Sequence, residues 1–446
     1  MIKSKLKCLL ITFFDVKGLV HYDFVPEGQT INQHYYLDVL RRLREAMKLP
    51  LFWAVTCTAI AFTYGAPSSS RILRLANTSN AFGFEVCRRL EKSGNLVICP
   101  YSISIAMGMV YLGSGGNTAA ELQQVLRYAE SGLLGESVHA AFSETAAQLG
   151  QRHAGEESTF RSANAVMVQN GHGGLMPFYR EKLLSQYGAS VDEVDFSEDG
   201  LEILTQLNAW VRARTDINTF LKEPFEADTR VALLNAVRFK GKWQTRFDDR
   251  VTVPDTFYAH GRVPKTVPMM QMKQRLPYDI SVRLDSYVLV LPYASNMSMV
   301  IFLPRERSGL EVLERIMTPT LFYNALSDLK EILVQIALPR FKMEADQELM
   351  PLLQNMGLRD VFDPTRANLT MLAKRAKGLS VSRVVSKTII EVNEEGTKAS
   401  GVTGVSAGVR IGGPLHDLFR ADHPFLFFIK DDATNLVLFM GRVVDP

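Results

Sequence analysis

Ser406 lies in a sequence motif that is typical of a catalytic serine. Residues 404–408 read Gly-Val-Ser-Ala-Gly, which matches the turn that holds the nucleophilic serine of many hydrolases. Such a turn needs a helix directly after it, and an acid and a histidine further along the chain. Residues 412–414, Gly-Gly-Pro, would interrupt that helix, and the acids and histidines at 416–423 are too close in sequence. We therefore expect that Ser406 is not catalytic and that the protein is not an enzyme.

The composition excludes several other classes of function. The histidines and cysteines show no His-Glu-x-x-His or Cys-x-x-Cys spacing, so we expect no metal and no cofactor. The net charge of +3 is small, and no run of Lys and Arg interleaves with aromatic residues. No apolar run is long enough to span a bilayer. Nucleic acid and membranes are therefore not expected partners.

One long segment, 396–413, consists almost entirely of small residues. Such residues cannot anchor a core, and a loop of this length is usually functional or disordered. Strands are expected on both sides of it. Arg410 is the only basic residue between Lys398 and Arg420.

The elements that hold this segment follow from hydrophobic periodicity. Helices are predicted at 82–90, 137–150, 177–187, 200–214 and 311–327, and Thr118 with Glu121 has the spacing of a capping box that starts another. Strands are predicted at 231–239, 286–292, 299–303, 332–338, 384–392, 425–429 and 437–443. Helices come first and strands later, which favours an α+β fold with mixed or antiparallel sheets.

The N-terminal residues differ from the rest of the chain. Residues 47–65 begin with Met-Lys, continue with a short apolar stretch and end with small residues, as a secretory signal peptide does. We expect 1–46 to be an upstream extension outside the fold, 47–65 a signal peptide, and 66–446 a single domain. The alternatives are a weaker signal at 3–14 and a buried helix that begins near Leu40.

Two cysteines, Cys87 and Cys99, remain after the expected signal peptide. They could form one disulfide or stay as separate buried thiols, and either way they make no disulfide framework. The sequence predicts a secreted, extracellular glycoprotein. Its Asn-x-Ser/Thr sequons are at Asn77, Asn296 and Asn368.

Four stretches of the chain carry family-specific sequence. The first, 95–104, runs from a predicted strand into a helix, and the second, 235–243, reads Asn-Ala-Val-Arg-Phe-Lys-Gly-Lys-Trp. The third, 392–399, reads Val-Asn-Glu-Glu-Gly-Thr-Lys-Ala. The fourth, 419–429, reads Phe-Arg-Ala-Asp-His-Pro-Phe-Leu-Phe-Phe-Ile. Together they resemble the serpin family, in the same order, over the whole predicted domain. The resemblance implies the serpin fold: three β-sheets with eight or nine helices and an exposed reactive-centre loop.

The resemblance also implies a single-use inhibitor. In inhibitory serpins the protease attacks the loop, and the cleaved loop inserts into the central sheet and distorts the protease. Family spacing places the reactive bond sixteen residues after Glu394, at Arg410-Ile411, and trypsin-like proteases bind Arg. We expect a monomer that forms a covalent 1:1 complex with a trypsin-like serine protease. A heparin-type polyanion is not expected, because the helix at 137–150 has His139 as its only near-basic residue.

The hinge of the loop fits insertion as a strand. Alternate side chains of a strand enter the core, so every second hinge residue must be small and uncharged. Within the hinge, Glu394 and Glu395 come first, Gly396 supplies backbone freedom, and the inward positions are Thr397, Ala399, Gly401 and Thr403. The alternative is a non-inhibitory serpin that acts as a carrier, chaperone or substrate. Bulky or charged inward residues would favour it, and they are absent.

The shutter, the region beneath the point where the sheet opens, departs from the family pattern at two positions. The family usually has Ser where Cys99 stands and His where Ser386 stands, whereas Ser102 and Asn235 are retained. Ser386 can still hydrogen-bond Asn235, but it is shorter than His and has no titratable ring. We expect these two departures to alter the rate of loop insertion.

Overall fold

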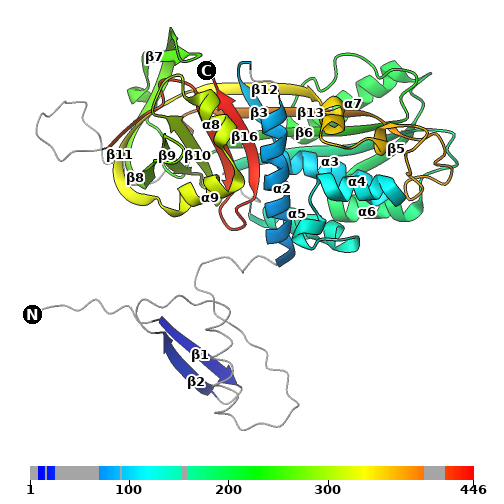
Figure 1. The fold of residues 1–446 in the computed structure, drawn as a ribbon, viewed down its shortest axis with the longest axis horizontal. Coiled ribbons are helices and arrows are strands. Elements are labelled where there is room, and N and C mark those ends of the chain that lie inside the picture. The colour runs from blue at the N-terminus through cyan, green and yellow to red at the C-terminus, as the bar shows by residue number, and fades with distance from the viewer. Residues whose placement is uncertain (1–8, 16–17, 26–69, 91–92, 153–157, 396–416) are drawn as a thin grey trace, which may run out of the picture. The chain divides into compact units, whose positions relative to one another are not determined.

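The computed structural model describes two compact units of the chain. The described residues are 9–15, 18–25, 70–90, 93–152, 158–395 and 417–446 (Figure 1). The units are Met1–Ala66 and Pro67–Pro446. In the first unit, strands β1 (Leu9–Asp15) and β2 (Gly18–Val25) form an antiparallel hairpin. The second unit contains all the elements discussed below.

Nine α-helices lie in the described part of the second unit. They are α2 (Ser70–Arg89), α3 (Pro100–Gly113), α4 (Gly116–Val125), α5 (Glu136–Arg152), α6 (Pro177–Tyr187), α7 (Gly200–Thr215), α8 (Leu310–Ile316), α9 (Pro319–Ser327) and α10 (Met350–Asn355). The helix predicted at 311–327 is two helices. The Thr318 hydroxyl accepts a hydrogen bond from the Leu321 N–H, and Pro319 starts the new helix.

The capping box predicted at Thr118 and Glu121 is wrong. Helix α4 begins at Gly116, so Thr118 lies inside its first turn. The Thr118 hydroxyl accepts the backbone N–H of Asn368 at 3.0 Å, and Glu121 Oε2 accepts that of Asp360 at 2.9 Å. Both side chains therefore anchor a distant segment of the chain instead of capping their own helix.

A five-stranded sheet forms one half of the second unit. Its strands, in order, are β12 (Phe341–Glu348), β13 (Val381–Val392), β6 (Val231–Gly241), β4 (Ser158–Gln169) and β5 (Ser190–Val194). Strands β13 and β6 are parallel and pair directly, from Val384 opposite Leu233 to Glu391 opposite Lys240. They are therefore immediate neighbours in the sheet.

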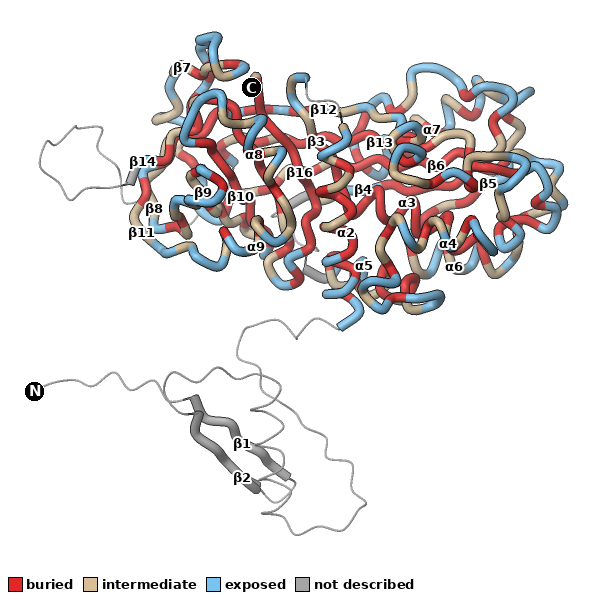
Figure 2. Tube along the Cα trace, viewed as in Figure 1, coloured by how far each residue is buried: buried red, intermediate tan, exposed pale blue. Residues whose placement is uncertain are grey.

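The two faces of β6 pack against different partners. Val231, Leu233 and Phe239 belong to the main core, whereas Ala232 and Ala236 belong to a smaller cluster. That smaller cluster also contains three side chains of α7, which covers this face of the sheet: Ile203, Leu207 and Val211. Because both faces are buried, the strand reads as an almost continuous apolar run (Figure 2).

A nine-stranded sheet forms the other half. Its strands, in order, are β14 (Asp417–Arg420), β11 (Lys330–Pro339), β8 (Val263–Ser281), β9 (Ser286–Pro292), β10 (Met297–Pro304), β15 (Phe425–Asp431), β16 (Val437–Val443) and β3 (Leu96–Ile98), with β7 (Val253–Ala259) paired to β8. The sheet is continuous through β8, which pairs with β11 along one part and with β9 along another. Each strand predicted from the sequence is confirmed, several with longer bounds.

Four phenylalanines hold helices onto the nine-stranded sheet. The ring centroid of Phe428 on β15 lies 5.6 Å from that of Phe84 on α2, 5.7 Å from that of Phe302 on β10 and 4.8 Å from that of Phe322 on α9. The rings are tilted or edge-on, which is the favourable arrangement for aromatic pairs.

Cys87 and Cys99 are both free thiols, so the possible disulfide between them does not form. Among the described residues, no helix is both long enough and apolar enough to cross a membrane.

The division into two units generates the first prediction. A chain that starts at Pro67 should keep the Tm of the full chain within about 2 °C, because the core described above is built from residues of the second unit. Differential scanning fluorimetry of both chains, at one fixed heating rate, measures this. A large fall in Tm for the shorter chain would show that residues 1–66 stabilise the fold.

Candidate functional site

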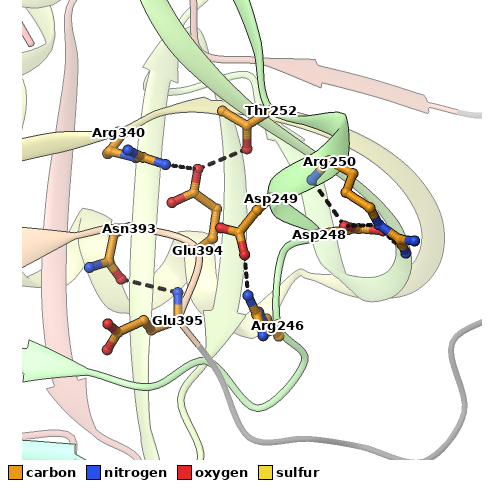
Figure 3. A network of polar contacts seen from close by, with 9 residues as sticks. All are labelled: Arg246, Asp248, Asp249, Arg250, Thr252, Arg340, Asn393, Glu394 and Glu395. Atoms are coloured by element: carbon orange, nitrogen blue, oxygen red, sulfur yellow. Dashed lines mark hydrogen bonds and ion pairs between the residues drawn. The ribbon is translucent and has the colours of Figure 1, made fainter.

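The candidate site lies where β13 leads into the long segment of small residues. Strand β13 ends at Val392, and Asn393, Glu394 and Glu395 are the last described residues before that segment (Figure 3). Outside the described residues lie Ser406, the predicted reactive bond Arg410-Ile411 and the hinge residues Gly396, Thr397, Ala399, Gly401 and Thr403.

Glu394 is a buried carboxylate held by two partners. Only 4% of its side chain is exposed, and it forms an ion pair with Arg340, whose side chain is 47% exposed. Thr252 Oγ1 donates to the same carboxylate oxygen at 2.8 Å. Burial raises the pKa of Glu394, but the hydrogen bonds from Arg340 and Thr252 outweigh burial, and the pKa is lowered from its ordinary value. The hinge therefore starts from an ionised, fixed side chain.

Glu395 and Asn393 tie the end of β13 to the end of β6. The Trp243 backbone N–H donates to the Glu395 carbonyl at 3.0 Å, and Trp243 Nε1 donates to the Asn393 carbonyl at 2.7 Å. Lys240 Nζ lies 3.0 Å from the Glu395 carboxylate. The Trp243 ring is buried and stacks on Tyr293 with centroids 4.2 Å apart. A rigid aromatic side chain thus fixes the corner at which the sheet would have to open.

A short acidic and basic turn positions Thr252. Asp248 accepts the Arg250 backbone N–H at 3.0 Å and the Arg250 guanidinium at 2.7 Å, and Arg246 pairs with Asp249 (Figure 3). Hydrogen bonds from Arg250 lower the pKa of Asp248 to about 2. These contacts order the turn from which the Thr252 hydroxyl reaches Glu394.

A second polar cluster, the predicted shutter, lies deeper between the same two strands. Asn235 on β6 and Ser386 on β13 are paired in register, and the Ser386 hydroxyl donates to Asn235 Oδ1 at 3.2 Å. Asn235 Nδ2 donates to Ser102 on α3 and to Asn164 Oδ1 on β4, the latter at 2.6 Å. All four side chains are buried. The polar atoms of the Asn235 amide are therefore satisfied by bonds that join α3, β4, β6 and β13.

Asn164 was not found from the sequence. It lies opposite Asn235 in the antiparallel pairing of β4 with β6. Strand β4 has too few regularly spaced apolar residues to be predicted as a strand, so this partner had no sequence signal.

Cys99 contributes packing and no hydrogen-bonded cap. It is buried and occupies the N-cap of α3 without a side-chain cap bond. Burial raises the pKa of its thiol to about 12, so the reactive thiolate form is suppressed. A serine at this position would have an oxygen able to cap the helix, which a thiol does poorly.

The three sequons lie in different surroundings. Asn77 is exposed on α2, and Asn296 is exposed in the turn before β10 with a φ of +56°. Asn368 is half-buried, and its Oδ1 accepts a hydrogen bond from Thr370 Oγ1 at 2.7 Å. The Asn368 side chain is thus already engaged in the fold.

Comparison with known proteins assigns residues 77–446 to a family model described as Serpin (serine protease inhibitor). Intracellular coagulation inhibitor 1 from Tachypleus tridentatus is 39% identical, with 83% of this chain and 89% of that protein covered. Iripin-3 from Ixodes ricinus is 38% identical, with coverages of 83% and 94%. The crystal structure of uncleaved ovalbumin superposes with a TM-score of 0.75 at 29% identity, covering 83% of this chain and 100% of ovalbumin.

A second family model matches the N-terminal residues. Residues 2–50 are similar to a model described as Transposase (partial DDE domain). This likeness covers a small part of the chain and ends before the first residue of the serpin match.

The predicted extracellular localisation is wrong. The coagulation inhibitor that is 39% identical to this chain is, by its name, an intracellular protein. The prediction of secretion rested on a basic residue, a short apolar stretch and small residues, and this pattern constrains a sequence only weakly. Residues 47–65, the predicted signal peptide, lie outside the described residues.

The Glu394 contacts generate the second prediction. Glu394→Gln should lower the Tm at pH 7 by about 2–6 °C, because Arg340 loses a buried anionic partner. The folded-state pKa of Glu394 is lowered, so its contribution is present above the pKa of a free carboxyl group and is lost as the pH falls through the folded value. The difference in Tm between variant and wild type should therefore shrink in acid.

Thermal unfolding from pH 7 to pH 3.5 at one fixed heating rate measures this difference. Asp285→Asn is the matched control, since it removes an exposed carboxylate from an ion pair with Arg305 that includes no residue of the Glu394 network, and it should change the Tm little. An equal effect of both variants, or an effect of Glu394→Gln that persists in acid, would contradict the role given to the buried charge.

Proposed function

The chain belongs to the serpin family, and from this premise we propose that it inhibits a trypsin-like serine protease that attacks it at the reactive bond Arg410-Ile411. Relatives such as intracellular coagulation inhibitor 1 support protease inhibition. The choice of a trypsin-like target rests on Arg410, whose guanidinium fits the acidic specificity pocket of such proteases.

The observation that carries the proposal is the direct pairing of β13 with β6 beside the start of the loop. These two strands form a closed seam, and the loop begins at the end of one of them. A cleaved loop that turned back after Glu395 would run antiparallel to β13, into the seam. This direction supports the proposal that the cleaved loop inserts between β13 and β6, whose pairing is reinforced by the two polar clusters described above.

The proposed reaction begins as ordinary proteolysis. The protease serine attacks the carbonyl carbon of Arg410, the bond to the Ile411 nitrogen breaks, and the released amine takes a proton from the protease histidine. Arg410 remains joined to the protease as an ester. Insertion of the loop then carries this acyl-enzyme away from its productive geometry before water can hydrolyse the ester, which gives a covalent 1:1 complex.

The pattern of small residues agrees with the side of the sheet that an inserted strand would meet. Ile390 and Val392 on β13 face the main core. In a tight antiparallel turn, Ala399 would lie opposite Ile390 and Thr397 opposite Val392, with their side chains on the same face. Small side chains at these positions can enter a core that is already well packed.

His423 and Asp422 support inhibition over hydrolysis by Ser406. His423 Nδ1 lies 2.8 Å from the Asp422 carboxylate, and His423 Nε2 lies 2.8 Å from the Pro304 carbonyl. Both ring nitrogens are thus committed to buried structural contacts. Neither is left to act as the base that a nucleophilic serine needs.

The third prediction concerns the reactive bond. Arg410→Ala should lower the rate of complex formation with trypsin on the order of a hundredfold or more, because the protease pocket loses its cationic partner. Lys398→Ala is the matched control, since it removes the other basic side chain of the loop and should keep the rate. Denaturing gels and mass spectrometry measure the complex and a released peptide that begins at Ile411. Complex formation by Arg410→Ala at the wild-type rate would refute the assignment of the bond.

The fourth prediction separates insertion from simple cleavage. Thr397→Arg should turn the inhibitor into a substrate, because an inward unpaired charge would have to be buried during insertion. Lys398→Arg changes the next residue, whose side chain would point away from the core in an inserted strand, and this variant should still trap the protease. The yield of gel-stable complex per mole of cleaved inhibitor measures this partition. Full trapping by Thr397→Arg would mean that insertion with this parity does not occur.

A further inference from the structure

Three neighbouring strands of the nine-stranded sheet, β8, β11 and β14, share a surface of exposed and half-buried residues, and β14 is the first described strand after the reactive-loop segment. In their pairing, Lys273 lies opposite Gln335, and Gln335 lies opposite Leu418. Arg275 lies opposite Leu333 in the next row. We name these five residues the outer face: Lys273, Arg275, Leu333, Gln335 and Leu418.

The direction of these side chains is set by the residues between them. Val334, Ile336 and Phe419 alternate with the outer-face residues on β11 and β14, and all three are fully buried in the main core. Successive side chains of a strand point to opposite faces, so the outer-face residues point away from the core. Leu418 is accordingly 56% exposed.

The outer face carries positive charge that the described part of the fold does not neutralise. Among the described residues, the side chains of Lys273 and Arg275 form no hydrogen bond or ion pair, and Glu331 in the adjoining row is not paired with Arg275. Arg420 on β14 differs, because it lies 2.7 Å from Asp255 and 3.2 Å from Asp422. Arg420 is thus used by the fold, whereas the two cations of the outer face remain available to a partner.

The length of chain between the reactive bond and β14 places a bound protease next to this face. Ile411 is six residues before Asp417, where β14 begins, so the bond lies within about 20 Å of that strand. A protease domain of about 240 residues has a radius of gyration of about 18 Å. A protease of this size that is bound at Arg410 would therefore lie close to β14.

Resting on the function proposed above, we propose that the outer face is a docking surface for the target protease and selects a protease with carboxylates on the rim of its active-site cleft. Lys273 and Arg275 attract those carboxylates during the encounter, and Leu418 supplies apolar contact beside them. Lys273 is half-buried and Arg275 is exposed, and surface charges of this kind act mainly on the association rate and are screened by salt. The loop thus chooses Arg-specific proteases, and the outer face chooses among them.

The test compares anionic trypsin with cationic trypsin, which share the Arg-specific pocket and differ in surface charge. The measured quantity is the second-order rate constant of complex formation in about 0.02 M and about 0.5 M salt. Wild type should react faster with anionic trypsin. For the double variant Lys273→Glu with Arg275→Glu, the rate with anionic trypsin should fall about tenfold in low salt and change little in high salt. Its rate with cationic trypsin should not fall.

The matched control reverses two exposed cations elsewhere, Lys374→Glu with Lys377→Glu, and gives the same net charge. It should change the rate with anionic trypsin much less than the outer-face variant does. An equal loss in both variants would reduce the effect to net charge and overturn the docking surface. An unchanged rate in the outer-face variant would overturn it as well.

Two further measurements distinguish a failure of the docking surface from a failure of the proposed protease inhibition. If wild type forms no complex with either trypsin, the proposed function fails, and the outer face is not the cause. If complexes form, Leu418→Ser should lower the rate with both trypsins by about threefold even in high salt, because apolar contact is not screened. Equal Tm values for wild type and the variants would show that the substitutions leave the fold intact.

Discussion

The direct pairing of two parallel strands, β13 and β6, is the constraint on which the rest of the structure depends. Buried parallel strands are normally permanent parts of a sheet, yet these two must separate if the loop is to insert. The two faces of the pair are built differently. Toward the main core β6 presents Leu233, Val237 and Phe239, whereas under α7 the sheet presents a smaller cluster of mixed size: Ala163, Ala165, Met167, Ala232, Leu234, Ala236, Val385 and Ile389.

Buried polar contacts join the strands of the seam to their surroundings at two places, the corner at Glu394 and the cluster around Asn235. Buried polar groups are strongly held when every partner is present, and separating them leaves each one unsatisfied. At the end of the seam the Glu394 carboxylate has an ionic and a neutral partner. In its middle the fastening is weaker, since the Ser386 hydroxyl reaches Asn235 over 3.2 Å, long for an O–H donor. Cys99, close by, adds no cap to α3. Both departures from the family pattern thus lie in one region, the predicted shutter, and neither lies at the Glu394 corner.

Much of this arrangement could be predicted from the sequence, and the remainder could not for physical reasons. Strands β9 and β16 were predicted with the bounds that they have, because both are short apolar runs between turn residues. Strand β8 was missed, since Pro264, Pro268 and Pro277 interrupt its pattern and its edges are satisfied only by tertiary pairing. The hinge motif identified Glu394, but Arg340 and Thr252 lie far away in sequence and are brought to it by strands whose register no local pattern specifies. At Thr118 and Glu121 the local spacing misled the prediction. It matched a capping box, but both side chains hydrogen-bond to backbone groups far away in sequence.

The strength of the seam has an optimum and not a maximum. On the proposed function, insertion would replace one parallel pairing by two antiparallel ones and bury additional chain. The native arrangement would then lie above the inserted one in free energy and would persist because the seam is slow to open. A stronger seam would delay insertion until water hydrolysed the acyl-enzyme, and the inhibitor would become a substrate. A weaker seam would open without a protease. On the proposed function, these two opposite demands would be met by different contacts. The ionised Glu394 at the end of the seam would resist opening before cleavage, and the Ser386 contact in the middle would offer little resistance once a strand began to insert.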